Sequence, residues 1–342
     1  MVINSSTRAT GENYNLESSD FRAKINSSMA LWERYYLAHN ISEALQSLAS
    51  SEGESRIIAG GTDLLLELQQ GRHPPVHTLV DIAQIPEMRK LELRPEPIQA
   101  ETPVVGSKQL IKDFLFIGAA LPLNLIVASR LVRQQAEALY EAASLIGGPQ
   151  VRNTATLGGN VAHALPAADG MIALLALDAQ AEIADSQGSQ HLPLLQLFRG
   201  PGQSALDPHR QILVGFHLPL RKPNQASAFR RIMRPQGVAI AILNMSIWLE
   251  RKDDLIQDIR IALGPAGPVP RRALATEEAL RNKPYNKKTL KAATQALLTE
   301  SRFRTSPHRA TEEYRRQMAA YLLEENLRTV WARADSDGGK VV

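Results

Sequence analysis

The chain has 342 residues, of which 44% are hydrophobic and 22% charged, and this composition is typical of a globular protein with two or three domains. The net charge is only +4, no nucleic-acid-binding signature is present and no apolar run approaches the roughly 18 residues of a membrane span, so we expect neither a nucleic-acid partner nor a membrane-spanning role. The absence of cysteine excludes disulfides, thiolate nucleophiles and any Cys-ligated zinc or iron–sulfur cluster within this chain.

The two ends of the chain differ in charge and hydropathy from its middle. The N-terminal residues are polar and lack the apolar core of a secretory signal, so we interpret residues 1–28 as a disordered extension and expect a cytoplasmic protein. Residues 271–334 hold 14 Lys and Arg against 7 Asp and Glu. Acidic pairs such as Glu312 and Glu313 interrupt this basic stretch, which favours a solvated helix surface over an anion-binding face.

The first folded segment alternates helices and strands around a pair of glycines. Apolar spacing and end signals predict a helix over 40–50, a strand over 55–60, a helix from Thr62 or Asp63 to Gly71 and a strand over 77–82. Together these elements make one small α/β unit.

The alternation continues through the rest of the chain. We predict a strand over 114–119, a helix over 125–146, a helix that begins near Pro166 and a hairpin that turns on Gly188. The Pro- and Gly-rich stretch 199–208 is a candidate domain boundary. Further predicted elements are strands over 211–219, 238–250 and 256–264 and helices over 273–282, 288–299 and 308–333. The pattern indicates an α+β fold and does not suggest a doubly wound sheet.

Two turns with adjacent glycines raise the question of a ligand. They read IIAGGTDLL at residues 57–65 and ATLGGNVAHALPAAD at residues 155–169. Paired glycines allow positive φ and a close ligand approach, and a turn that opens a helix gathers free N–H groups that bind phosphate oxygens. Thr62, Thr156 and Asn160 add side-chain donors. One such turn is equally typical of an ordinary helix start, whereas two of them favour a dinucleotide cradle.

Other nucleotide signatures are weaker. No P-loop sequence is present. The stretch GPGQSA at 200–205 formally matches G-x-G-x-x-A, but Pro201 and Pro208 favour a loop there.

Several longer segments occur in a characteristic order. They are IIAGGTDLL, LVDIAQIPEM, FIGAALPLNLI, QVRNTATLGGNVAHALPAADGMIALLALDA, LFRGPGQSALDPHRQILVGFHLP, ALGPAGPVPRRALATEEAL and YRRQMAAYLLEENL. In these segments the chain resembles the FAD-binding (medium) subunits of the molybdenum hydroxylases, the group that contains xanthine dehydrogenase and the aerobic carbon monoxide dehydrogenase. The resemblance covers the chain from about Trp32 to about Val330.

The resemblance implies a fold in two parts. A two-subdomain FAD-binding unit (PCMH-type) would occupy residues 29–203, with subdomains of about 29–85 and 86–203. A smaller C-terminal α+β domain would follow over residues 204–334, and residues 335–342 would be a tail.

The resemblance also implies which residues hold FAD. The two glycine motifs of the family grip the FAD pyrophosphate, and they carry over to Ile58, Ala59, Gly60, Gly61, Thr62 and Asp63, with Thr156, Leu157, Gly158, Gly159 and Asn160. Asp169 is expected to accept hydrogen bonds from ribityl or ribose hydroxyls, because an ionised carboxylate only accepts. Arg230 takes the place of a basic residue that contacts the flavin in relatives, and residues 116–123 are expected near the isoalloxazine ring.

Non-cofactor interpretations of some of these residues remain open. Asp63 and Asp169 would each also be favourable at a helix start without any ligand. We interpret His163 as structural, and Arg152 as ordering the glycine loop by hydrogen bonds. The scheme requires no catalytic acid–base residue and no metal ligand from this chain.

By resemblance, the chain is one component of a larger oxidoreductase. Substrate would be hydroxylated at the molybdenum cofactor of a large subunit, and electrons would pass through the [2Fe–2S] clusters of a small subunit to noncovalent FAD here. NAD, a quinone or oxygen would accept them, and the assembly is expected to be a dimer of heterotrimers. Two alternatives stay open: a stand-alone FAD-dependent oxidase, and a scaffold subunit that has lost flavin.

Overall fold

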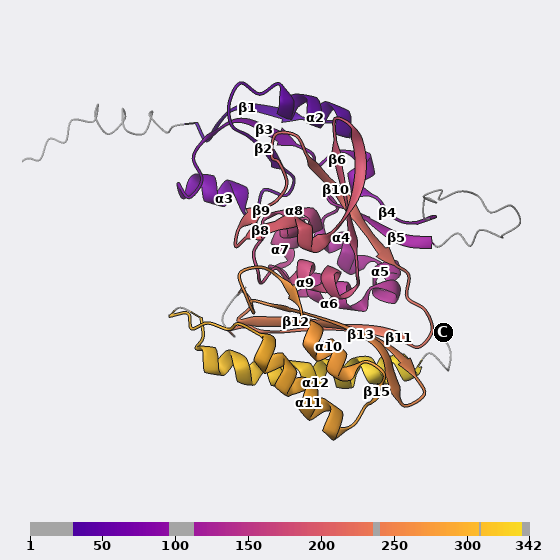
Figure 1. Ribbon diagram of the computed structural model, residues 1–342. Helices are drawn as coiled ribbons and strands as arrows, with labels where there is room; N and C mark the ends of the chain where they lie inside the picture. Colours follow the sequence, from indigo (N-terminus) through magenta and orange to yellow (C-terminus); the bar gives the residue numbers. More distant parts are fainter. Residues whose placement is uncertain (1–29, 96–112, 235–239, 308, 337–342) are drawn as a thin grey trace, which may run out of the picture.

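The computed structural model describes residues 30–95, 113–234, 240–307 and 309–336. Three sheets succeed one another from the N-terminal part at the top of Figure 1 to the C-terminal part at the bottom. The expected extension 1–28 lies outside the described residues, and so does most of the expected tail 335–342.

The first subdomain is a three-stranded parallel sheet with two helices. Its elements are β1 (Trp32–Leu37), α2 (Ile41–Ala49), β2 (Ser55–Ile58), α3 (Leu64–Gln69) and β3 (Val76–Asp81), with the strand order β1-β3-β2. Helix α2 is confirmed, and the side chain of Asn40 caps it by accepting the N–H of Glu43 at 2.9 Å. The sequence pattern does not reveal β1, because five of its six residues are exposed and no apolar alternation results.

The second subdomain contains an antiparallel sheet. Its strands are β4 (Leu91–Pro95), β5 (Asp113–Gly118), β6 (Gln180–Asp185), β7 (Gly188–Pro193) and β10 (Ile212–Pro219), in the order β4-β5-β10-β6-β7. Two short 3-10 helices belong to this part of the chain: η1 (Pro86–Arg89) precedes β4, and η2 (Leu194–Leu197) follows β7. The predicted hairpin is confirmed, with Gly188 directly after its turn.

Strand β10 places the division between the sheets later than the sequence suggests. The family resemblance implies that residues 204–219 belong to the C-terminal domain, whereas β10 pairs with β5 on one side and β6 on the other, at the centre of the second sheet. The Pro- and Gly-rich stretch forms a local two-stranded ribbon, β8 (Phe198–Gly200) and β9 (Gln203–Ser204). Proline and glycine mark turns, and a turn lies within a domain as readily as between two.

A layer of short helices lies between the second and third sheets. The helices are α4 (Leu123–Ala128), α5 (Arg130–Gln135), α6 (Glu137–Leu145), α7 (Pro149–Arg152), α8 (Leu157–Ala162) and α9 (Asp169–Ala176). The single helix predicted over 125–146 is wrong, because the chain leaves helical conformation at Ser129 and Ala136. The Ser129 hydroxyl caps the next turn by accepting the N–H of Val132. All eight residues of α9 are buried, which fits its central position in Figure 1.

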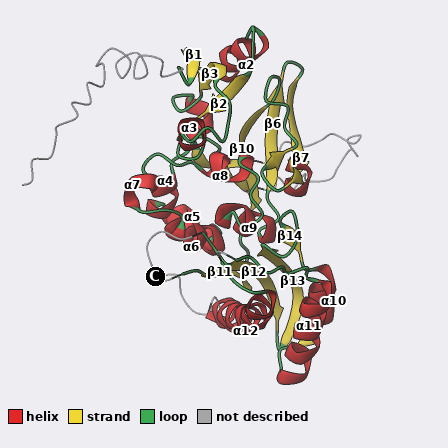
Figure 2. Cartoon of the chain, turned by 90° about the vertical axis from the view of Figure 1, so that its left-hand side faces the viewer, coloured by secondary structure: helices red, strands yellow, loops and turns green. Residues whose placement is uncertain are grey.

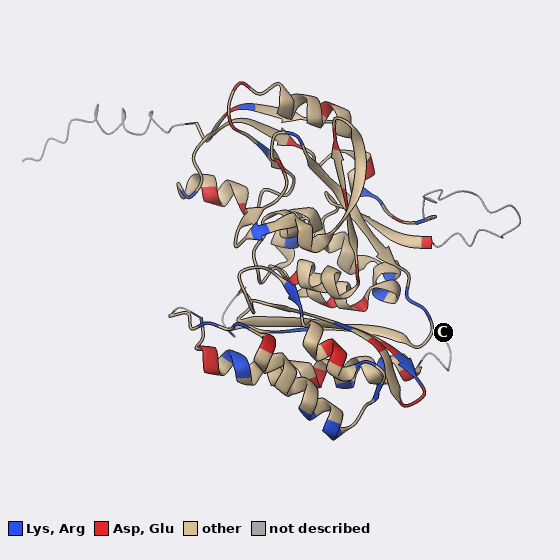
Figure 3. Ribbon diagram, in the orientation of Figure 1, with Lys and Arg blue, Asp and Glu red and all other residues tan. Residues whose placement is uncertain are grey.

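The C-terminal part is an antiparallel sheet covered by helices. Its elements are β11 (Gln225–Ile232), β12 (Leu243–Lys252), β13 (Leu255–Gly264), β14 (Arg271–Arg272), α10 (Leu274–Leu280), β15 (Lys283–Pro284), α11 (Lys287–Glu300) and α12 (Glu312–Ser336). Figure 2 shows α10, α11 and α12 on one face of this sheet and α9 on the other. Acidic and basic residues alternate along α12 (Figure 3), but its Arg315 is buried and is not part of a solvated surface.

One apolar core joins the second subdomain to the C-terminal sheet. Phe229, Trp248 and Ala262 of that sheet belong to the same buried cluster as the residues of α9. The α+β architecture predicted from the sequence is confirmed. In the part of the chain that is described, no helix is both long and apolar enough to cross a membrane.

Candidate functional site

The two glycine turns, which belong to different subdomains, pack directly against each other. The first turn joins β2 to α3, and the second leads into α8. A β-carbon on Gly60 would lie 2.1 Å from the carbonyl oxygen of Thr154 and 2.9 Å from Cα of Ala155. Glycine at position 60 is therefore required by the close approach of two backbones, which brings both sequence motifs to one place.

The first turn presents a row of unpaired backbone donors. Gly61 has a φ of +67°. Within the described ranges, the N–H groups of Gly60, Gly61, Thr62 and Asp63 donate no hydrogen bond. Consecutive free N–H groups in such a turn form a concavity that binds anions, so the first turn has the form predicted for a phosphate cradle.

The second turn uses more of its backbone donors within the protein. The N–H of Gly158 donates to the carbonyl of Ala119 at 2.9 Å, and that of Gly159 to the hydroxyl of Thr156 at 3.0 Å. The side-chain oxygen of Asn160 accepts the N–H of Gly170 at 3.0 Å, so its amide nitrogen remains as the donor. The second turn therefore lacks the free N–H groups of Gly158 and Gly159 that were expected. The hydrogen-bond donor that it can offer to a ligand is the side-chain amide of Asn160.

Both turns line a cavity of about 1080 Å³ that elements of all three parts of the chain enclose. The predicted site residues that line it are Ile58, Ala59, Gly60, Gly61, Thr62, Asp63, Thr156, Gly158, Gly159, Asn160 and Asp169. Ala119 and Leu123, from the segment expected near the isoalloxazine ring, line it as well. The structure thus gathers residues that lie more than a hundred positions apart in the sequence.

Two predicted residues do not line the cavity. The side chain of Leu157 is fully buried in the apolar core beneath α8. Arg230 donates from Nη2 to the Thr329 hydroxyl of α12 at 3.0 Å and is exposed. Successive side chains of a strand point to opposite faces, so it is the neighbouring Arg231 that lines the cavity.

Arg231 forms a buried polar cluster with Asp169 and Asn244. Its Nη1 donates to Oδ2 of Asp169, and Nδ2 of Asn244 donates to Oδ1 of the same carboxylate at 2.6 Å. Burial raises the pKa of Asp169, and Arg231 and Asn244 partly offset this effect. Among the described residues, Nε of Arg231 and Oδ1 of Asn244 are buried without a hydrogen-bond partner. The cluster therefore presents at the cavity wall the Asp169 carboxylate, held in place by Arg231 and Asn244.

Three arginines line the C-terminal side of the same cavity. They are Arg304, Arg309 and Arg315, and within the described ranges none of them forms an ion pair with a carboxylate. Arg315 is almost fully buried and donates from Nη1 to the carbonyl of Ile242, while its Nε has no partner there. Burial lowers the pKa of Arg315, and Arg309 and Arg304 lower it further. Positive charge therefore gathers at this side of the cavity.

His163 links the two glycine motifs through their helices. Its Nε2 lies 3.0 Å from Oε1 of Glu67 on α3, and its Nδ1 lies 3.7 Å from Oδ2 of Asp63. Arg152 donates from Nη1 to the carbonyls of Ile146 and Gly147, at 3.1 and 2.7 Å. Both side chains have structural contacts of the kind interpreted from the sequence. The sequence pattern gave no signal for Arg231. Arg304, Arg309 and Arg315 belong to the basic stretch 271–334, which was expected to be a solvated surface, and the fold instead brings these three to the cavity.

The walls of the cavity suit a large, anionic dinucleotide such as FAD. Its volume slightly exceeds the roughly 300–1,000 Å³ of pockets for drug-sized ligands. Free backbone N–H groups stand at the first glycine turn, and arginine side chains, Arg231 and Arg315 among them, line the C-terminal side. A pyrophosphate and a ring with carbonyl oxygens would satisfy both sets of donors.

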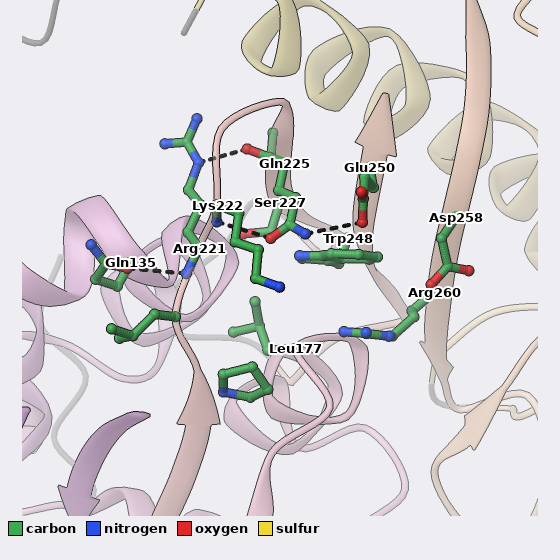
Figure 4. A pocket seen from close by; sticks show the side chains of 13 residues that line it. Gln135, Leu177, Arg221, Lys222, Gln225, Ser227, Trp248, Glu250, Asp258 and Arg260 are labelled. Carbon is green, nitrogen blue, oxygen red and sulfur yellow. Dashed lines mark hydrogen bonds between the residues drawn. The ribbon is translucent and has the colours of Figure 1, made fainter. Parts of the chain in front are cut away.

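A second hollow lies where the chain crosses from the second to the third sheet. Figure 4 shows Lys222 pointing into it and Arg260 beside Trp248, whose ring centroid lies 4.0 Å from the guanidinium carbon. Its volume of about 190 Å³ is below the range of drug-sized pockets. This hollow is therefore too small for a dinucleotide.

Two family models match the chain. Residues 26–221 match the FAD binding domain in molybdopterin dehydrogenase, and residues 227–330 match the CO dehydrogenase flavoprotein C-terminal domain. The gap between the two matches, residues 222–226, runs from the turn after β10 to the start of β11, where the sheets divide.

Similar proteins cover nearly the whole chain. The xanthine dehydrogenase FAD-binding subunit of Escherichia coli O157:H7 is 30% identical over 308 residues, which are 90% of this chain and 98% of that protein. The carbon monoxide dehydrogenase medium chain of Hydrogenophaga pseudoflava is 25% identical over 87% of this chain and 97% of its own length. A solved carbon monoxide dehydrogenase from the same organism superimposes with a TM-score of 0.77 at 26% identity, over 88% of this chain and 97% of that one.

Proposed function

The chain belongs to the FAD-binding subunits of the molybdenum hydroxylases, and we propose that it carries electrons on FAD between the [2Fe–2S] clusters of a small subunit and an external acceptor. The observation that carries this proposal is the single cavity formed by both glycine turns, Asp169 and Arg231. The relatives are dehydrogenase subunits, so the chain is an oxidoreductase component with FAD as its cofactor.

Each wall of the cavity has a role in this proposal. The N–H groups of residues 60–63 and the amide of Asn160 hold the pyrophosphate, and Asp169 accepts from hydroxyls of the ribityl chain or the ribose. Arg231 fixes the Asp169 carboxylate by their ion pair. FAD supplies the capacity to take up and release electrons, while the protein sets the position and potential of the ring.

The arginines on the C-terminal side are proposed to tune the ring. Positive charge beside an isoalloxazine favours the reduced form, because reduction adds negative charge to the ring. Arg304, Arg309 and Arg315 supply such charge without carboxylates that would neutralise it among the described residues. The acceptor that then takes the electrons is NAD, a quinone or oxygen.

Partner subunits complete the proposed enzyme. The chain has no cysteine with which to hold an iron–sulfur cluster. We therefore propose a small [2Fe–2S] subunit and a large molybdenum-cofactor subunit, assembled as a dimer of heterotrimers. Relatives are named as a medium chain, a medium subunit and a subunit of a dehydrogenase complex, which supports an assembly of several subunits.

The test compares the complete complex with the isolated chain. Substrates named for relatives, among them xanthine, nicotinate and aldehydes, would be added without oxygen while the flavin absorbance is followed. We expect bleaching in the complex only. Bleaching of the isolated chain by a substrate would support the stand-alone oxidase instead, and a complex without flavin would support the scaffold.

A further inference from the structure

Three metal-ligand side chains meet on the second sheet, away from the flavin cavity. His217 lies on β10, Glu182 on β6 and His191 on β7. Glu182 stands directly opposite His191 in the β6–β7 register and diagonally to His217, which pairs with Gln180. Side chains of paired residues share one face of a sheet, so the three converge over β6. None of the three lines the flavin cavity.

The geometry within this cluster is close. Nε2 of His217 lies 2.8 Å from Oε2 of Glu182, and the ring centroids of His191 and His217 are 4.2 Å apart. One ligand atom from each side chain lies within 4.8 Å of the other two. Around a tetrahedral zinc ion with bonds of about 2.0–2.1 Å, ligand atoms lie roughly 3.3 Å apart. Small side-chain rotations therefore suffice to close the three ligands on one ion.

The His217 ring is held in place, and one of its nitrogens has no partner. Phe114 and Phe116 flank the ring at centroid distances of 4.3 and 5.2 Å. The residue is 9% exposed, and its Nδ1 is buried without a hydrogen-bond partner among the described residues. His191, by contrast, is exposed, which gives an ion a path from solvent. The ring is thus fixed with Nε2 towards Glu182, and Nε2 is the nitrogen that can ligate an ion shared with that carboxylate.

We propose that Glu182, His191 and His217 bind a divalent transition-metal ion, in the first place Zn²⁺. Two imidazoles and one carboxylate form a set that suits zinc and does not suit the all-oxygen preferences of Mg²⁺ or Ca²⁺. The ion fastens the edge strand β7 and its neighbour β6 to the central strand β10. Three protein ligands leave a fourth position for water. The site is independent of the proposed electron transfer.

The experiment titrates the untagged full-length chain, first dialysed against a chelator, with ZnCl₂ in a calorimeter. We expect one Zn²⁺ per chain, and affinity at least about tenfold lower in each of the variants His191→Gln and Glu182→Gln. His77→Gln is the matched control, because His77 lies 3.8 Å from the Glu33 carboxylate and belongs to no three-ligand cluster of the described residues. The control variant should bind Zn²⁺ like the unaltered chain.

A second readout separates binding from misfolding. Zn²⁺ should raise the melting temperature of the unaltered chain and of His77→Gln but not of His191→Gln, whose exposed side chain is not needed for folding. The flavin content should stay the same with and without the chelator. The proposal is overturned if the chain takes up no Zn²⁺, or if His191→Gln binds it as tightly as the control, and the cluster is then an ion pair only.

Discussion

Gly60 and Thr154 lie so close together that a β-carbon at position 60 would approach the Thr154 carbonyl oxygen to 2.1 Å. The first residue lies in the turn after β2, and the second precedes the TLGG motif of α8. Their contact fixes the first subdomain against the second at the wall of the flavin cavity. Two motifs that the sequence separates by almost a hundred residues therefore act as one structural unit.

The variant Gly60→Ala should separate the two turns. Because the added methyl group would meet backbone atoms that cannot rotate away, we expect a loss of roughly 1–3 kcal/mol in the free energy of unfolding together with weaker FAD binding. Urea unfolding and FAD titration measure the two effects. Gly267→Ala is the control, because its β-carbon would have no neighbour nearer than 3.8 Å. Equal stability of both variants would contradict the close contact.

Gly159→Val should empty the flavin site while the fold persists. A β-carbon there would meet only the Thr156 hydroxyl, at 3.2 Å, so the added bulk enters the cavity side of the turn. Gly61→Val should also lose flavin, but its φ of +67° adds backbone strain. The measurement is flavin content per chain alongside far-ultraviolet circular dichroism. Full flavin occupancy in both variants would contradict the assignment of the two glycine turns to the FAD pyrophosphate.

Arg231→Met should weaken FAD binding, whereas Arg230→Met should not. Arg231 pairs with Asp169 at the cavity, and its loss leaves a buried carboxylate without its cation. We expect FAD affinity to fall by at least about tenfold. Arg230 bonds to Thr329 on the opposite side of β11, so its substitution should change stability by no more than about 0.5 kcal/mol. If Arg230→Met weakened FAD binding more than Arg231→Met does, Arg230 and not Arg231 would be the flavin contact.

Glu277→Ala should destabilise the C-terminal domain strongly. The carboxylate is 1% exposed, accepts two hydrogen bonds from Arg272 at 2.5 and 2.6 Å and also accepts the N–H of Ile261. Its removal leaves the partly buried Arg272 without its carboxylate and the N–H of Ile261 without its acceptor, and we expect a loss of about 3 kcal/mol. Trp248 and Trp331 report on this domain in urea unfolding followed by fluorescence. The neighbouring Glu278, whose side chain is mostly exposed, gives the control Glu278→Ala with little change.

Tyr35 should lose its proton at a higher pH than an ordinary tyrosine does. Its hydroxyl donates to Oδ2 of Asp81, and this bond, followed by burial, raises the pKa of Tyr35 to about 12. Since the folded-state pKa is raised, the stabilisation is complete below the unfolded value of about 10 and is lost as the pH rises through 12. Alkaline titration of tyrosine absorbance should show a group with a pKa of about 12 that is missing in Tyr35→Phe. If the group lost in Tyr35→Phe titrates at about 10 instead, the bond to Asp81 is excluded.

The sequence predicted the elements whose signals are local. Helix α2 has its cap at Asn40 and a regular apolar stripe, and both glycine motifs stand out by composition. Strand β11 carries polar and charged residues among its apolar ones and was not predicted as a strand. Because β11 was not predicted, the alternation of side chains along a strand could not be used to place Arg230 and Arg231 on opposite faces. The carry-over from the family motif therefore selected the neighbour of the residue that lines the cavity.

Other features depend on pairings that no local pattern encodes. Strand β10 follows a Pro- and Gly-rich stretch, yet it returns to the middle of the second sheet between β5 and β6. The same return brings His217 to Glu182, 35 positions away in the sequence. The basic side of the cavity arises in the same way, because Arg304 and Arg309 come from the segment before α12.

The most direct test of the account is the flavin content of the purified chain, from its absorbance spectrum and chromatographic identification of the released cofactor. The cavity formed by the two glycine turns predicts FAD at close to one per chain. A colourless protein that also fails to take up added FAD would contradict the account and leave the scaffold in its place.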